Sequence, residues 1–140
     1  MGKDTELKRS RDWALYEVYK KGLQDQRFST QKEAINWVFQ QPAPQFFLSS
    51  KSLAVHLGEL TRTGSLPVYE ATREKILRLA EMYQQYIDEH PDSGLSKDLI
   101  CEALVESPAP SFYASKETIR KIIQRGMRDD RLRILRRYSR

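Results

Sequence analysis

A short phrase built on two prolines occurs twice in this chain and constrains its fold more than any other feature. Residues 42–49 read Pro-Ala-Pro-Gln-Phe-Phe-Leu-Ser, and residues 108–115 read Pro-Ala-Pro-Ser-Phe-Tyr-Ala-Ser. Apolar residues on either side of the phrase recur in the same register. We therefore interpret the chain as a tandem repeat of two similar units.

Composition limits the class of protein. The chain has 140 residues, of which 39% are hydrophobic and 31% are charged, as is typical of a folded globular protein. One repeat of about 65 residues would be only marginally stable alone, so we expect the two repeats to pack as one body. No apolar run approaches the roughly 20 residues that span a bilayer, and the N-terminus lacks the apolar core of a signal peptide. The single cysteine, Cys101, agrees with a reducing compartment, and we predict a cytoplasmic protein.

Three segments of the first half have the apolar spacing of helices. We predict helices at 7–23, at about 31–40, and from Ser49 or Ser50 onward. Thr30 and Glu33 form a capping box at the start of the second helix. The predicted apolar positions are Trp13, Tyr16, Tyr19 and Leu23 in the first helix, Ala34, Ile35, Trp37, Val38 and Phe39 in the second, and Leu53, Leu57 and Leu60 in the third.

The second half repeats this pattern, with helices predicted at 72–89, after Ser96 and after Ser115. No segment shows the strict alternation of a β-strand. The predicted fold is therefore all-α. We assign a first three-helix repeat to 1–62, a linker to 63–70, a second three-helix repeat to 71–126 and, beyond Gly126, a basic C-terminal helix or tail to 127–140.

The Pro-Ala-Pro phrase joins the second and third helices of each repeat, and its prolines favour an extended connector. Side chains alternate in direction along an extended segment, so one ring of each aromatic pair is expected to fill the core while the other faces outward. The simpler interpretation is that both rings pack between helices as core aromatics; the alternative is that the outward ring is a stacking platform for a base or a ligand. The two pairs are Phe46 with Phe47 and Phe112 with Tyr113.

Positive charge is concentrated at the C-terminal end. Residues 1–115 contain 14 Lys and Arg against 16 Asp and Glu, whereas residues 116–140 contain 10 against 3. Such a cluster can be a solvated face, or it can be cations placed favourably at a helix C-terminus. However, its charge is mostly arginine, whose guanidinium forks onto phosphate oxygens. The residues predicted to contact nucleic acid are Lys116, Arg120, Lys121, Gln124, Arg125, Arg128, Arg131, Arg133, Arg136 and Arg137.

The corner before the third helix resembles that of helix-turn-helix domains, in which the last helix enters the major groove. The two predicted third helices differ in the face that they would present. In the second repeat this face is basic, whereas in the first it is nearly neutral and contains Ala54 and Val55. We expect the second repeat to meet nucleic acid and the first to pack against its sister repeat, a second copy or another protein.

Few residues suggest catalysis. His56 and His90 stand in unlike contexts, and Cys101 lies inside an apolar segment, where we expect it to be part of the core. The chain has no glycine-rich phosphate loop and no clustered metal ligands. We predict a non-enzymatic protein without catalytic residues, metal or cofactor.

The repeated phrase resembles a Pro-Ala-x-Arg-Phe-Tyr-Val-Ser segment, followed by a helix, in small uncharacterised bacterial proteins. The resemblance covers about 25 residues in each copy, with Gln45 or Ser111 in place of the arginine. It implies a bacterial or mobile-element origin and carries no function.

Two functions fit these observations. The first is binding of nucleic acid, with DNA the expected ligand, through the third helix of the second repeat and the C-terminal arginines. The alternative is a helical protein–protein adaptor or assembly protein, in which the arginines contact an acidic protein surface and the first repeat forms a homo-oligomer.

Overall fold

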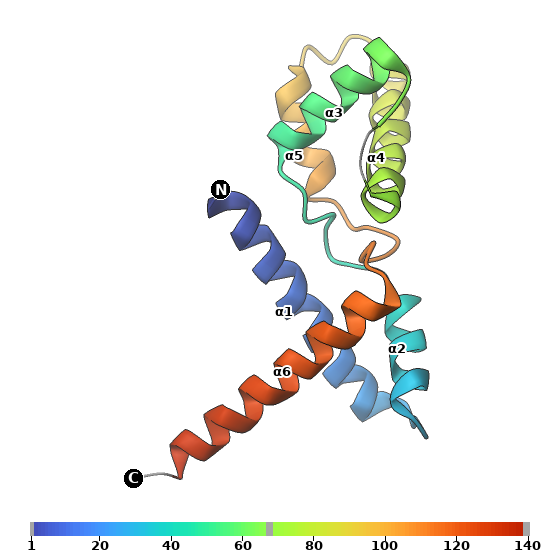
Figure 1. The fold of residues 1–140 in the computed structure, drawn as a ribbon. Coiled ribbons are helices and arrows are strands. Elements are labelled where there is room, and N and C mark those ends of the chain that lie inside the picture. Colours follow the sequence, from blue (N-terminus) through green and yellow to red (C-terminus); the bar gives the residue numbers. More distant parts are fainter. Residues whose placement is uncertain (1, 67–68, 139–140) are drawn as a thin grey trace. The chain divides into compact units, whose positions relative to one another are not determined.

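The computed structural model describes residues 2–66 and 69–138, which form six helices and no β-strand (Figure 1). This confirms the all-α prediction. The helices are α1 (Gly2–Asp25), α2 (Gln31–Phe39), α3 (Ser50–Thr63), α4 (Glu70–Glu89), α5 (Lys97–Val105) and α6 (Lys116–Arg137).

Four of the helices begin at a capping side chain that the sequence predicts. The hydroxyl oxygens of Thr30, Ser49, Ser96 and Ser115 each accept a hydrogen bond from the backbone N–H three residues further on, at 3.0–3.2 Å. Each bond satisfies an amide that has no partner within the helix. Glu33 accepts from the backbone N–H of Ser29 at 2.7 Å, one residue before the amide that a standard capping box would use.

The chain divides into two compact units that do not follow the sequential boundaries 1–62 and 71–126. Unit 1 contains the start of α1, up to Lys8, and Pro44–Ala109, and unit 2 contains Arg9–Ala43 and Pro110–Arg140. Unit 1 therefore holds α3, α4 and α5, and unit 2 holds most of α1 together with α2 and α6. Each unit combines two helices from one half of the chain with the third helix of the other half.

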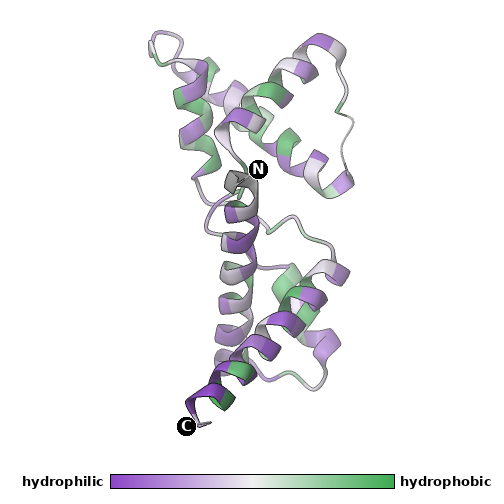
Figure 2. Ribbon diagram, turned by 60° about the vertical axis from the view of Figure 1, so that its left-hand side comes forward, coloured by the Kyte–Doolittle hydropathy of each residue, from purple (hydrophilic) through white to green (hydrophobic). Residues whose placement is uncertain are grey.

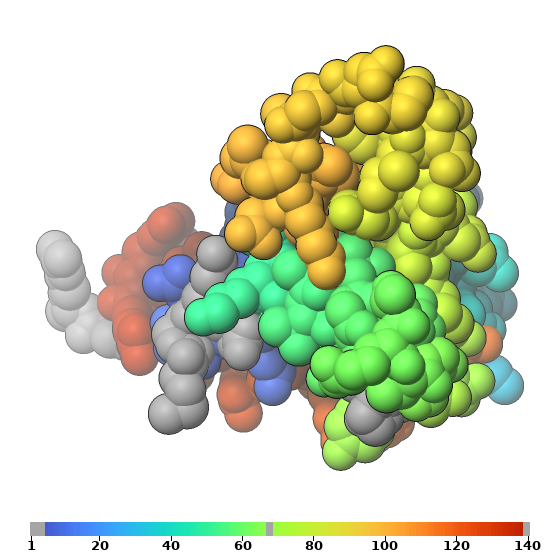
Figure 3. Space-filling model, turned by 90° about the horizontal axis from the view of Figure 1, so that it is seen from above, coloured from blue at the N-terminus to red at the C-terminus, as the bar shows by residue number. Residues whose placement is uncertain are grey.

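In unit 1, α3 packs against both α4 and α5, and the three helices form adjoining surfaces (Figure 3). Leu53 and Leu57 of α3 are buried, as are Ile76 and Leu79 of α4. The backbone N–H of Phe46 donates to the carbonyl of Val105 at 3.0 Å. This bond anchors the first connector at the end of α5, so α3 begins beside α5.

In unit 2, α2 packs against α6, and both helices contribute buried aliphatic side chains. Two glycines provide room for aromatic rings. A Cβ atom at Gly22 would lie 2.5 Å from the Trp37 ring, and one at Gly126 would lie 2.5 Å from the Tyr16 ring. The prediction that the third helix ends at Gly126 and a separate helix follows is wrong. α6 continues through Gly126, and this glycine leaves room for the Tyr16 ring.

The predicted apolar stripe of α1 is correct only in part. Trp13 is 68% exposed and Leu23 is 50% exposed, whereas Leu15, outside the predicted stripe, is fully buried. The buried face contains Leu15 and Tyr19, with Gly22 beneath Trp37. A helix of 24 residues carries apolar side chains on more than one face, and spacing alone does not show which face is covered.

Neither connector is extended throughout. Phe47 has a φ of 53° and Tyr113 a φ of 52°, both in the left-handed region. A bulky side chain in this region costs roughly 1–2 kcal/mol. This turn places both Phe46 and Phe47 in the core, whereas Phe112 is buried and Tyr113 half-buried. The simple alternation of inward and outward rings is therefore wrong for the first connector, and its two rings are core aromatics.

Candidate nucleic-acid interface

All ten predicted contact residues lie on one helix, α6, within unit 2. Three isoleucines, Ile119, Ile122 and Ile123, are buried and fix which face of α6 turns inward. The remaining faces of the helix carry its basic residues. The second half of α6 is mostly hydrophilic, with hydrophobic residues interspersed (Figure 2).

Four of the ten residues form a row that we call the outer stripe: Lys121, Gln124, Arg128 and Arg131. Their spacing of three and four residues places them on one side of the helix, and all four are exposed. Within the described part of the chain, Lys121 and Arg131 make no ion pair, and Arg128 approaches only its neighbour Asp129, at 3.9 Å. The outer stripe therefore offers cations that the protein's own acids leave largely unmatched.

Arg136 and Arg137 extend this positive charge into the last turn of α6. Neither side chain forms an ion pair with any described residue. Both lie near the negative end of the helix dipole, which stabilises cations there.

The other four predicted residues are held by partners within unit 2. Arg120 pairs with Glu117, Arg125 lies 3.6 Å from Asp12, and Arg133 lies 2.8 Å from Asp130. The Nζ of Lys116 lies 5.1 Å from the centre of the Phe39 ring. The hydrogen bond from Arg120 lowers the pKa of Glu117, so this exposed carboxyl stays charged beside the arginine.

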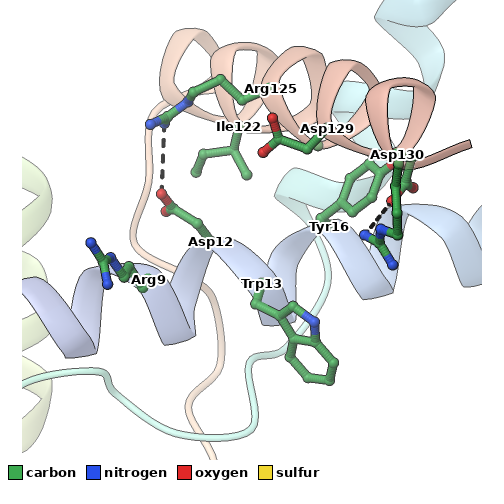
Figure 4. Close-up of a pocket in the computed structure, with 10 residues that line it drawn as sticks. Arg9, Asp12, Trp13, Tyr16, Ile122, Arg125, Asp129 and Asp130 are labelled. Atoms are coloured by element: carbon green, nitrogen blue, oxygen red, sulfur yellow. Dashed lines mark hydrogen bonds and ion pairs between the residues drawn. The ribbon is translucent and has the colours of Figure 1, made fainter. Parts of the chain in front are cut away.

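An open groove of about 260 Å³ runs between α1 and α6 within unit 2 (Figure 4). The lining residues recur every three or four positions along each helix, so they lie on one face of α1 and one face of α6. The lining residues are Arg9, Asp12, Trp13 and Tyr16 from α1 and Ile122, Arg125, Gly126, Asp129, Asp130 and Arg133 from α6.

Asp130 is the polar anchor of this groove. The Tyr16 hydroxyl donates to Oδ2 of Asp130 at 2.7 Å, and Nη2 of Arg133 donates to Oδ1 at 2.8 Å. Burial, and then the hydrogen bond and negative charge of Asp130, raise the pKa of Tyr16 well above its ordinary value of 10.0. Tyr16 is therefore a fixed donor that holds α1 against α6.

The residues considered for catalysis lie in unit 1 and are not gathered together. Cys101 is fully buried, which confirms its assignment to the core, and burial raises the pKa of its thiol. Nδ1 of His56 lies 3.7 Å from Glu59, and Nδ1 of His90 lies 3.1 Å from the carbonyl oxygen of Tyr86. Among the described residues, no three His, Cys, Asp or Glu side chains are grouped so as to hold a metal ion.

Two features of the interface were not predicted from the sequence. Trp13 was expected in the core but lines the groove, and α6 belongs to the unit that contains α2. A possible signal was that Trp13 has no apolar residue four positions away on either side, since Arg9 and Glu17 occupy those sites. On α3 in unit 1, Val55 is 54% exposed and Ala54 is half-buried, so part of the face assigned to a protein partner is open.

Comparison with protein-family models, with curated proteins and with solved structures finds no match for this chain. Among the helices that the structure describes, none combines the length and the hydrophobicity that crossing a membrane requires.

Proposed function

We propose that this chain is a non-enzymatic, cytoplasmic nucleic-acid-binding protein whose ligand contacts the outer stripe, Arg136 and Arg137. The distribution of charge between the units is the observation that supports this most strongly. Unit 2 contains sixteen Lys and Arg against seven Asp and Glu, a net charge of +9, whereas unit 1 contains eight against twelve, a net charge of −4. A surface of this sign and density attracts a polyanion.

The chemistry of the outer stripe suits phosphate contact with limited reading of bases. Arg128 and Arg131 can each place two N–H donors on phosphate oxygens, and Lys121 adds a third cation. Gln124 lies among them and can both donate to and accept from a base edge. Roughly four to six phosphates would be in contact, and affinity would depend more on salt than on sequence.

The likeness to a helix-turn-helix domain takes a different form from the one that the sequence suggests. In unit 2 the helix that packs with α2 is α6, which begins 77 residues after the last residue of α2. We propose that α2 supports α6 as the first helix of such a domain supports its recognition helix. The second Pro-Ala-Pro phrase, residues 108–115, then matters because it leads the chain from α5 to α6, which packs with α2 of the first half.

Matched charge variants of the full chain test the proposal. Fluorescence anisotropy with labelled duplex and single-stranded probes would compare Lys121→Gln/Arg128→Gln/Arg131→Gln with Lys51→Gln/Arg62→Gln/Lys97→Gln. All six residues are exposed, but the first three lie on α6 in unit 2 and the last three lie in unit 1. We expect the first variant to lose affinity on the order of 100-fold at 0.1 M salt and the second to lose much less. Absence of wild-type binding to every probe at low salt would end the proposal.

A second candidate function is a protein–protein adaptor, which the exposure of Val55 favours. At 54% exposure on α3, this side chain is available to an apolar partner. Light scattering and partner capture with Val55→Glu test it. A change in assembly state or in captured partners supports the adaptor, and an unchanged result excludes this face as the contact.

The duplicated organisation of the chain is also a proposal, and matching backbone conformations support it. Phe47 and Tyr113 occupy equivalent places in the two Pro-Ala-Pro phrases and have φ values of 53° and 52°. Ser49 and Ser115 follow two residues later, and both cap a helix. We infer that one ancestral unit was duplicated and that only the second copy gained the basic third helix.

A further inference from the structure

Trp13 is exposed in a way that the packing of unit 2 does not explain. It is 68% exposed, and its indole ring extends from α1 away from α6 at the edge of the groove (Figure 4). The chain's other tryptophan, Trp37, covers Gly22 and lies 5.8 Å from the Phe28 ring. Tryptophan has a large apolar surface that normally gains by burial, so an open ring in a groove that also contains Arg9 and Arg125 suits a ligand with a flat face.

Arg125 belongs both to the groove that Trp13 lines and to the part of α6 next to the outer stripe. Arg125 lines the groove and lies one turn after Lys121, whose carbonyl oxygen accepts from its Nε at 3.5 Å. Arg9, one turn before Trp13 on α1, makes no ion pair with any described residue and also lines the groove. Arg9 and Arg125 therefore line the same groove as Trp13.

Two of the three carboxylates that line the groove, those of Asp12 and Asp130, are already matched by donors of unit 2. Asp12 lies 2.9 Å from Arg11 and 3.6 Å from Arg125, and Asp130 is held by Tyr16 and Arg133. Asp129 lies 3.9 Å from Arg128. The negative charge of Asp12 and Asp130 is thus offset within the protein, which reduces its repulsion of a phosphate at the groove edge.

We propose that Trp13 stacks against an unpaired base of a single-stranded nucleic acid whose phosphates follow the outer stripe and Arg125. The inference rests on the proposed function and adds the class of ligand to it. Bases in a duplex are stacked on one another and show only their edges, whereas a single strand can present the face of a base to an aromatic ring. The arrangement therefore favours single strands over duplexes.

Substitution of Trp13 in the full chain tests this. Anisotropy titrations with labelled oligothymidine and with a duplex of equal length would compare wild type, Trp13→Ala and Trp13→Phe. Tyr69→Ala is the matched control, because Tyr69 is 88% exposed but lies in unit 1. We expect Trp13→Ala to weaken single-strand binding about 10-fold and duplex binding less than about twofold, with Trp13→Phe close to wild type.

The outcomes separate this inference from the proposed function. If wild type binds and Trp13→Ala binds the single strand equally well, the stacking site is wrong and nucleic-acid binding stands. Equal weakening of both probes also overturns the stacking site, because a general surface contact would do the same. If no probe binds at low salt, both the proposed function and the inference fail. A selective loss on the single strand with an unchanged salt dependence supports stacking, since an uncharged ring displaces no counterions.

Discussion

Units 1 and 2 share one helix pairing and differ in charge and in their use of glycine. In each unit a nine-residue helix with a Ser or Thr cap packs against a third helix that the other half of the chain supplies. Yet the net charge is −4 in unit 1 and +9 in unit 2. Buried aliphatic residues contribute to the packing of both units, and the surface charge is what sets the units apart.

The glycines show how the two packings differ. In unit 2, Gly22 and Gly126 lie under aromatic rings, where a Cβ atom would collide. In unit 1, Gly64 and Gly94 have φ values of 72° and 71° and allow left-handed turns, and Gly58 has open space around it. Unit 2 therefore depends on close helix contact, and unit 1 uses glycine mainly to change chain direction.

The largest expected effects come from shortening buried side chains on α3 and α6, the two helices that pack with helices of the other half of the chain. Leu53 of α3 and Ile123 of α6 are both fully buried, so Leu53→Ala and Ile123→Ala should each cost about 2–5 kcal/mol. Because α3 belongs to unit 1, Leu53→Ala should weaken hydrogen-exchange protection most in α4 and α5, and Ile123→Ala most in α2. The reverse pattern would show that each third helix packs within its own half.

Glycine-to-alanine substitutions should have opposite signs in the two units. Gly126→Ala places a Cβ atom 2.5 Å from the Tyr16 ring and should destabilise by about 1–3 kcal/mol. At Gly58 the nearest atom is 4.0 Å away, so Gly58→Ala should stabilise by about 0.5–1 kcal/mol through helix propensity. Urea unfolding measures both, and a stabilised Gly126→Ala would remove the distinction between the units.

The left-handed residues should behave the same way in both units. At positions 47 and 113, glycine should be more stable than alanine by about 1 kcal/mol, because only glycine adopts a φ near 50° without strain. This reverses the order expected in a helix. Thermal unfolding of the Gly and Ala variants at each position provides the comparison, and alanine proving better at either one would contradict the shared conformation.

The smallest effect concerns the hydrogen bond between Tyr16 and Asp130. Tyr16→Phe should lose about 0.5–1.5 kcal/mol at neutral pH. The folded protein raises the pKa of Tyr16 above 10.0, so the unfolded chain releases this proton first, and wild type should lose stability as pH rises above about 10. Urea unfolding between pH 8 and about 11 should give a shallower decline for Tyr16→Phe; parallel curves would mean that Tyr16 does not cause it.

Local structure was largely predictable from the sequence, because capping and proline act over a few residues. The caps at Thr30, Ser49, Ser96 and Ser115 and the limit that Pro42 sets for α2 follow from side-chain chemistry alone. The partner of each third helix was not predictable. The apolar stripes of α3, with Leu53 and Leu57, and of α6, with its three isoleucines, are similar. Such a stripe shows which face of a helix is buried but not which other helix covers that face.

The residue types of the candidate site were predictable from the sequence, but the partners of those residues were not. The arginines of α6 are evident from the charge distribution, whereas the pairing of Arg125 with Asp12 and of Arg133 with Asp130 depends on packing within unit 2. Gly126 was taken as a helix end, since sequence does not show that a ring covers it. Trp13 was assigned to the core for the same reason, because its surroundings depend on contacts distant in sequence.

The salt dependence of nucleic-acid affinity tests most directly whether the excess charge of unit 2 binds a polyanion. For four to six phosphate contacts, the logarithm of the association constant should fall against the logarithm of salt concentration with a slope of about −3 to −5. The outer-stripe variant should reduce the magnitude of that slope by about 2–3, and the matched unit 1 variant should leave it unchanged. A wild-type slope near zero, or an equal reduction in the two variants, would contradict the account.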